Sequence, residues 1–298
     1  MKKTSLVIVI GLLCILSIGY YWRYIVLPQQ KETALIAYGQ DLIAHTSKYF
    51  GPKGKLQYST NGMNCQNCHL ESGTKTWGLN YIAVYRSYPK YRARSGTVES
   101  IYKRVNDCFE RSLNGKALDT TSKEMQAIYA YIKSLGKTRN TNQEMASTSL
   151  ATLPFLPRAA SPEKGEPLFI KNCQSCHGRQ GQGLLDSTTA TYVYPPLWGA
   201  HSYNNAAGLF QISKLASFIK NNMPNAVTYQ KPVLTDQEAW DVAAYINSQP
   251  RPQKNVSKDF PNKAEKPIDY PFGPYSDDYS EQQHKYGPFG MMQSSHKK

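Results

Sequence analysis

The sequence predicts a mainly α-helical protein with two small domains in tandem, an apolar N-terminal segment and a C-terminal tail. Three observations predict this fold class. An uncharged run follows two N-terminal lysines, the pattern Cys-x-x-Cys-His occurs twice, and two helical segments share an Ala-Tyr-Ile triplet after a capping motif. The 298 residues are enough for two compact domains with flanking segments.

Residues 1–28 are predicted to be a signal peptide or a membrane anchor. Lys2 and Lys3 precede 19 residues without a charge (4–22), a run long enough to cross a bilayer. No good Ala-x-Ala cleavage site lies before residue 40. A cleaved leader and a retained anchor both remain open. In either case we expect export to the periplasm, with the body soluble after cleavage or tethered to the inner membrane.

The composition is basic, with 35 Lys and Arg against 21 Asp and Glu and a formal net charge of +14. Such a balance suits nucleic acid, an acidic protein or a small anion. The sequence contains neither a basic low-complexity arm nor a nucleic-acid-binding motif, so we expect no nucleic-acid partner. Part of the charge also suits the propionates of a haem.

Two pentapeptides carry the chemistry: CQNCH at 65–69 and CQSCH at 173–177. Two thiols three residues apart can bond the two vinyl groups of a haem, and the following His reaches its iron. A Cys-x-x-Cys pair alone also suits a redox pair or half a zinc site. Two copies, both followed by His in an exported chain, favour two covalently attached haem c groups. The predicted haem-binding residues are Cys65, Cys68, His69, Cys173, Cys176 and His177.

Composition and motifs divide the chain into five parts. The expected bounds are 1–28 for the membrane segment, 29–137 for the first domain, 138–160 for a linker, 161–249 for the second domain and 250–298 for the tail. The linker is rich in Thr, Ser, Asn and Pro. The tail is rich in Pro, Tyr, Lys and Asp, a composition that by itself is typical of disorder.

The two domains repeat one pattern, a haem motif near the start and a capped helix near the end. Thr121 with Glu124, and Thr235 with Glu238, are predicted capping boxes, in which a hydroxyl and a Glu satisfy free helix-end donors. Both helices then carry Ala-Tyr-Ile at the same place. A divergent internal duplication of this kind predicts two helical domains of the cytochrome c type.

The repeat also predicts the distal ligands of the two irons. Met223 lies 46 residues after His177 and precedes Pro224, the usual position of a thioether ligand. Met223 lies 15 residues before Glu238, and Cys108 lies 16 before Glu124. The duplication therefore places Cys108 where the second domain has its methionine. The predicted metal ligands are His69, Cys108, His177 and Met223.

Cys108 is the one thiol outside the membrane segment that the haem motifs leave unassigned. It could be a small buried hydrophobic residue, but its basic surroundings favour a reactive thiolate. Arg104, Arg111 and Ser112 are each about one turn from it, and Arg94 precedes the helix. We expect that helix to be capped by Thr97 and to end at Asn114. These arginines could otherwise be solvated or pair with propionates.

At these residues the sequence resembles the dihaem thiosulfate dehydrogenases, or tetrathionate synthases. Their first domain is related to the cysteine-ligated haem subunit of the Sox sulfur-oxidation system. The resemblance covers about Ala37 to Gly290. The matching stretches are YRARSGTVESIYKRVNDCFERSLNGKAL, NNMP, LTDQEAWDVAAYINSQPRP and PFGPYSDDYSEQQHKYGPFG. The match in the tail implies an extended segment that packs on the domains.

The resemblance implies a role for each matching position. Cys108 would ligate the first haem and carry the sulfur chemistry, Arg94 and Arg104 would hold the anionic substrate, and Met223 would ligate the second haem. Some members have Lys just before that methionine and exchange ligands on reduction. This chain has Asn222 there, so we expect plain His/Met ligation.

The implied reaction joins two thiosulfates into tetrathionate and passes two electrons through the haems to an external acceptor such as a soluble cytochrome. Some relatives run the reverse reaction, and the sequence does not set the direction. One alternative is a dihaem electron-transfer cytochrome without sulfur chemistry of its own. Another is a Sox-type protein that loads sulfur onto a carrier protein.

Overall fold

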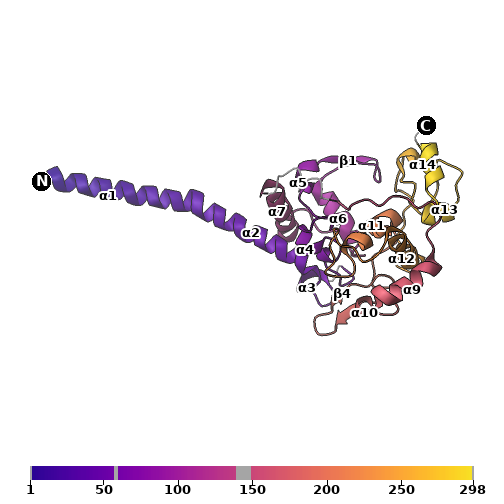
Figure 1. Cartoon of the computed structure of the whole chain (residues 1–298). Coiled ribbons are helices and arrows are strands. Elements are labelled where there is room, and N and C mark those ends of the chain that lie inside the picture. The colour runs from indigo at the N-terminus through magenta and orange to yellow at the C-terminus, as the bar shows by residue number, and fades with distance from the viewer. Residues whose placement is uncertain (1, 57–59, 139–148, 297–298) are drawn as a thin grey trace.

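The computed structural model describes residues 2–56, 60–138 and 149–296. It shows a mainly helical body of two domains from which one long N-terminal rod projects, with two short antiparallel ribbons in the body (Figure 1). The predicted fold class is confirmed. Residues 139–148 of the predicted linker lie outside the described part of the chain.

The rod consists of α1 (Lys2–Tyr21), a π-helical turn (Trp22–Val26) and α2 (Leu27–Ala44). It contains a helix long and apolar enough to cross a membrane, with none of the apolar window buried in the body. Only the C-terminal turns of α2 enter the core, where Leu42 and Ile43 are buried. The rod and the first domain are therefore joined by one continuous helix.

The first domain packs α2 against α7 (Lys123–Thr138), with α6 (Ile101–Arg111) across them. Its smaller elements are α3 (Thr46–Phe50), a 3-10 turn (Cys65–Asn67), α4 (Leu70–Gly73), α5 (Val84–Ser87), β1 (Lys90–Arg92) and β2 (Thr97–Glu99). Phe50 and Phe109 meet edge to face in the core. This packing fixes the face of α6 that carries Cys108.

Two predicted helix starts in this domain were wrong by a few residues. Thr97 does not cap α6, because it pairs with Arg92 in the β1–β2 ribbon, and Ser100 accepts the hydrogen bond from the Lys103 amide instead. Thr121 does not cap α7, because its hydroxyl donates to Asp119; the next residue, a serine, accepts from the helix. In both helices a side-chain hydroxyl caps the N-terminus, as expected, but the capping residue is a serine further along the chain.

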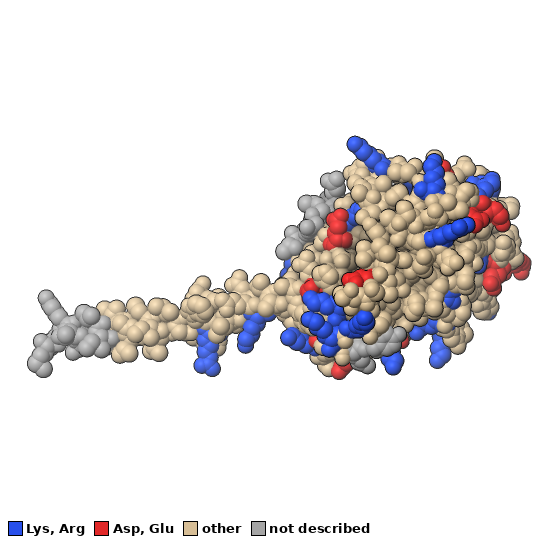
Figure 2. All heavy atoms as spheres, turned by 90° about the horizontal axis from the view of Figure 1, so that it is seen from below, with Lys and Arg blue, Asp and Glu red and all other residues tan. Residues whose placement is uncertain are grey.

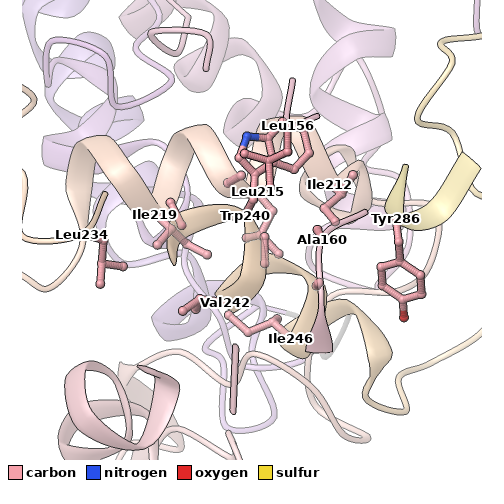
Figure 3. Packing of buried hydrophobic residues seen from close by; sticks show 14 of the residues in the cluster. Leu156, Ala160, Ile212, Leu215, Ile219, Leu234, Trp240, Val242, Ile246 and Tyr286 are labelled. Carbon is pink, nitrogen blue, oxygen red and sulfur yellow. The ribbon is translucent and has the colours of Figure 1, made fainter. Parts of the chain in front are cut away.

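The second domain contains α9 (Pro162–Asn172), α10 (Gln174–His177), β3 (Leu184–Asp186), β4 (Thr191–Tyr194), a 3-10 turn (Gly208–Phe210), α11 (Ile212–Asn222) and α12 (Asp236–Ser248). The predicted capping box of Thr235 and Glu238 is present. Trp240 is buried between Leu156, Leu215 and the other residues of the core (Figure 3).

The duplication is visible where the first and last helices of each domain cross. A Cβ built on Gly39 of α2 would lie 2.0 Å from the carbonyl oxygen of Ala127 in α7, and one on Gly165 of α9 would lie 1.9 Å from that of Asp241 in α12. In both crossings the Cβ of the tyrosine in the Ala-Tyr-Ile triplet would also be close, at 2.9 Å. Glycine is needed at both positions because the two backbones touch.

The tail crosses both domains. It is mostly extended but includes a 3-10 turn (Lys263–Glu265), α13 (Glu281–Tyr286) and α14 (Gly290–His296). Near its start Asp259 binds arginines of the first domain, and near its end Phe289 packs on Trp240 of the second. The composition of this tail suggested disorder, but Phe260, Tyr270, Tyr286 and Phe289 are buried.

Candidate active site

The first haem motif lies between α3 and α4, with its residues on the walls of two adjoining cavities. The two cavities have volumes of about 580 and about 180 Å³, and both are lined by Cys68, His69 and Cys108. The ring of His69 places Nδ1 2.6 Å from the carbonyl oxygen of Leu79. A carbonyl can only accept, so Nδ1 carries the proton and Nε2 is left as the basic nitrogen, as a metal ligand requires.

The second motif has the same arrangement. His177 places Nδ1 2.8 Å from the carbonyl oxygen of Pro195, which again leaves Nε2 basic. A cavity of about 370 Å³ is lined by His177, by both cysteines of the motif and by Met223 at the end of α11. Both sites thus present two thiols, an imidazole and a sulfur from a later element, which is the donor set that a covalently attached haem needs.

Cys108 lies on α6 and differs from the motif thiols in its ionisation. Burial raises the pKa of Cys65 and of Cys68 to about 12. Burial also acts on Cys108, but lowering effects, the largest of which is the charge of the Arg104 guanidinium, outweigh it and bring its pKa to about 6. Arg104 Nη1 donates to Cys108 Sγ at 2.9 Å, one helical turn away. The cavity therefore holds two neutral thiols and one thiolate.

Two further arginines of the larger cavity are held by the tail. Arg94 Nη1 donates to Asp259 Oδ2 at 3.1 Å and to the carbonyl oxygen of Ala206 at 2.8 Å. Arg111 forms a two-pronged contact with the same carboxylate, at 2.8 and 3.0 Å. Both arginine side chains are 17% exposed. Arg94 is therefore not a free cation, because a buried carboxylate already shares its charge.

The structure brings the predicted residues Cys108, Arg94 and Arg104 together on one cavity beside His69. It also brings in residues that the sequence did not indicate, among them Asp259 from the tail and Lys214 from α11. Asp259 is 165 residues from Arg94 along the chain, so no local spacing could connect the two. Arg104 and Arg111 did indicate an anion-binding cavity beside Cys108, because they lie on the same helix as this cysteine.

A helical fold with two such donor sets is that of a c-type cytochrome, a class of protein whose domains hold haem c covalently. Two family models match the chain: the SoxA/TsdA cytochrome c domain at residues 55–139 and the cytochrome c domain at residues 162–250. The chain belongs to the thiosulfate dehydrogenase family, as its relatives show.

The thiosulfate dehydrogenase of Stutzerimonas stutzeri is 37% identical over 76% of this chain and 72% of the relative. That of Psychrobacter arcticus is 38% identical, over 79% of this chain and 69% of the relative. Among solved structures, thiosulfate dehydrogenase (TsdBA) from Marichromatium purpuratum, in its as-isolated form, matches with a TM-score of 0.67 and 32% sequence identity. The match covers 75% of this chain and 47% of that one, so this chain spans about half of the solved protein.

Proposed function

We propose that this protein oxidises thiosulfate, joining two molecules into tetrathionate with the release of two electrons. The observation that carries the proposal is the contact of Arg104 with Cys108 inside a cavity lined by further arginines. A pure electron carrier does not require a thiolate held by arginine. The names of the relatives support the same substrate.

Two haem c groups are part of the proposal. Cys65, Cys68 and His69 would hold the first, in a domain spanning 29–137, with Cys108 as its distal ligand. The second domain, 161–249, would hold the other through its motif residues Cys173, Cys176 and His177, with Met223 as the distal ligand. When bound, the haems supply redox capacity for two electrons, one each.

The sulfur chemistry belongs to Cys108. Its thiolate forms a sulfur–sulfur bond with the terminal sulfur of one thiosulfate, and this oxidation releases two electrons. A second thiosulfate then attacks the thiosulfate sulfur of the adduct, which forms tetrathionate and expels the Cys108 thiolate. Atoms and charge balance without a proton. The lowered pKa of Cys108 keeps the thiol ionised at neutral pH, both as nucleophile and as leaving group.

The arginines lower the electrostatic barrier. Two dianions and a thiolate repel one another strongly in a partly desolvated cavity. Arg104 neutralises the thiolate, and Arg94 provides donors for sulfonate oxygens, held in place by Asp259 and the Ala206 carbonyl. Donors fixed before the reaction need no rearrangement when the new bond forms.

The electrons would leave to a soluble cytochrome or a similar acceptor. We place the body in the periplasm, where c-type haem is attached, with 1–28 either cleaved or retained as an anchor.

The experiment is thiosulfate-dependent reduction of ferricyanide by the haem-loaded protein, with tetrathionate measured as the product. We expect activity in the wild type and a loss of at least a hundredfold in Cys108→Ala, with both haems still attached. Cys108→Met should also be inactive, because a thioether cannot form the adduct. Tetrathionate formation at a near wild-type rate by Cys108→Ala would contradict the mechanism and favour the electron-carrier alternative.

A further inference from the structure

The cations of the larger cavity fall into two groups. Arg94 and Arg111 bind Asp259, and Arg104 binds the Cys108 thiolate. Arg92, at the end of β1, and Lys214, on α11, also line the cavity. Within the described part of the chain, neither side chain lies within 4.0 Å of a carboxylate oxygen. These two cations are therefore available to an anion that enters.

Lys214 comes from the other domain and faces the first. Its side chain is accessible to solvent within the cavity, although protein surrounds it. Burial and the charges of Arg94, Arg104 and Arg92 lower its pKa to about 8, against an opposing effect of Asp269. That carboxylate is already engaged, because Asp269 Oδ2 accepts from the amide of Ser213 at 3.0 Å. A cation crowded by other cations gains more from a bound anion than an isolated one does.

We propose that Lys214 and Arg92 form the binding site for the second thiosulfate, the one that attacks the Cys108 adduct. This inference rests on the proposed function and adds a second anion site to it. Two dianions that react in sequence need two sets of cations, because the first set stays occupied by the adduct. The arginines near Cys108 provide one set, and the pair across the domain boundary provides the other. The second domain would thus bind substrate as well as carry electrons.

The main test compares steady-state kinetics of Lys214→Gln with those of Lys220→Gln. Lys220 lies on the same helix, does not line the cavity and pairs with Asp236 at 2.9 Å. Loss of one charge-assisted contact should raise KM for thiosulfate about tenfold in Lys214→Gln and leave kcat within about twofold. We expect Lys220→Gln to keep the wild-type KM and Lys214→Arg to restore it, since arginine keeps the charge.

Two readouts separate binding from a structural effect. In a Cys108→Ala background, equilibrium dialysis with labelled thiosulfate should show two sites, one of which binds about tenfold more weakly when Lys214 is also changed to Gln. In the wild type, KM should rise as the pH increases through about 8, because the neutral amine no longer attracts the dianion. Arg92, Arg94, Arg104 and Asp269 act most strongly on Lys214, and Asp107, Cys108, Arg111 and Glu265 line the same cavity. Lys214→Arg should remove the rise without altering any of them.

An unchanged KM in Lys214→Gln would overturn the inference. The inference would also be overturned if Lys214→Gln left the affinity for thiosulfate unchanged but shifted the reduction potential of the first haem. That combination would indicate that Lys214 pairs with a haem propionate instead of with substrate. Should Lys214→Gln fail to fold, Lys214→Met, which keeps the apolar stem, provides the same comparison. A wild-type protein that makes no tetrathionate would contradict the proposed function instead.

Discussion

Asp259 is the residue through which the tail acts on the site. Burial opposes its ionisation, but the hydrogen bond from Arg111 and the charges of Arg94 and Arg111 outweigh that effect and lower its pKa. Tyr270 also donates to it at 3.0 Å. A carboxylate with a lowered pKa stabilises the folded protein above its ordinary pKa and stops doing so as the pH falls below that value.

We predict that Asp259→Asn weakens both stability and substrate binding. Removing the charge takes away the carboxylate that Arg94 and Arg111 share, which should lower the free energy of unfolding by about 3 kcal/mol. Chemical denaturation at pH 7 measures this change, and the difference from wild type should shrink as the pH falls below about 4. We also expect a KM several times higher. The control is Asp278→Asn, which changes an exposed residue of the tail. If the Asp259→Asn protein is as stable as this control, Asp259 does not stabilise the fold through its arginine partners.

Met223 is the residue that we expect to set the higher reduction potential. Met223→Gly should abolish a sulfur-to-iron absorption band and lower the potential of one haem, because a thioether favours reduced iron. A redox titration followed by absorbance measures both changes. The haem beside Cys108 should titrate as in the wild type. Unchanged spectra would assign the distal ligand to another residue.

Sequence spacing predicted those members of the site that are neighbours on one element, the internal repeat added Met223, and the family resemblance added a role for Arg94. Arg104 and Cys108 share a helix, and the haem motifs are contiguous, so their spacing was informative. Arg92 and Lys214 reach the cavity from a ribbon and from the second domain, and Asp259 of the tail binds two arginines of its wall. Only the packing of the domains and the tail brings these residues together. Long-range contacts of this kind leave no periodic signal in a single sequence.

At the scale of elements, the helix crossing is the feature that both domains share. The helices themselves were predictable from capping residues and apolar periodicity, although α6 starts later than expected because Thr97 belongs to a ribbon. Val98, the residue after the expected cap, lies in β2 and is 67% exposed. The close approach at Gly39 and Gly165 was not predictable, because a glycine in a helix gives no sign of what faces it.

We predict that Gly39→Ala and Gly165→Ala each destabilise their own domain. A methyl group at either position would overlap a backbone carbonyl, and the helices would have to move apart, at a cost of about 2–3 kcal/mol. Thermal unfolding followed by circular dichroism measures the loss. Gly19→Ala, where no atom lies within 4 Å of the added carbon, should leave the unfolding of both domains unchanged. If all three variants are equally stable, the helices at these two crossings can accommodate a methyl group, and their backbones are not in close contact.

At the scale of the whole molecule, the rod carries the features of a membrane anchor. Four aromatic residues, Tyr20, Tyr21, Trp22 and Tyr24, follow the apolar run and are more than half exposed. Such residues are typical of the membrane–water interface. The lysines at the other end would stay in the cytoplasm. Basic residues also spread over the globular body, with a group near the base of the rod (Figure 2).

We predict that the protein stays in the membrane fraction after an alkaline carbonate wash, because a segment of this length and hydropathy spans a bilayer. Replacing residues 1–28 with a cleavable leader should make it soluble with unchanged activity. N-terminal sequencing of the purified wild-type protein shows independently whether the N-terminal segment is retained or cleaved. A mature chain that begins after residue 22 would show that the segment is a signal peptide.

If the anchor is retained, the rod runs without a break from the membrane segment into the first domain. Its length outside the membrane therefore sets the height of the site above the lipid. Residues 25–34 form the part of the rod between the aromatic residues and the packed end of α2, and 10 helical residues rise about 15 Å. Anionic headgroups repel a dianion, but salt screens that field over about 8 Å at physiological ionic strength. The rise of the helix is about twice this screening distance. The cavity would therefore lie beyond the field of the headgroups, where thiosulfate is as concentrated as in bulk solution.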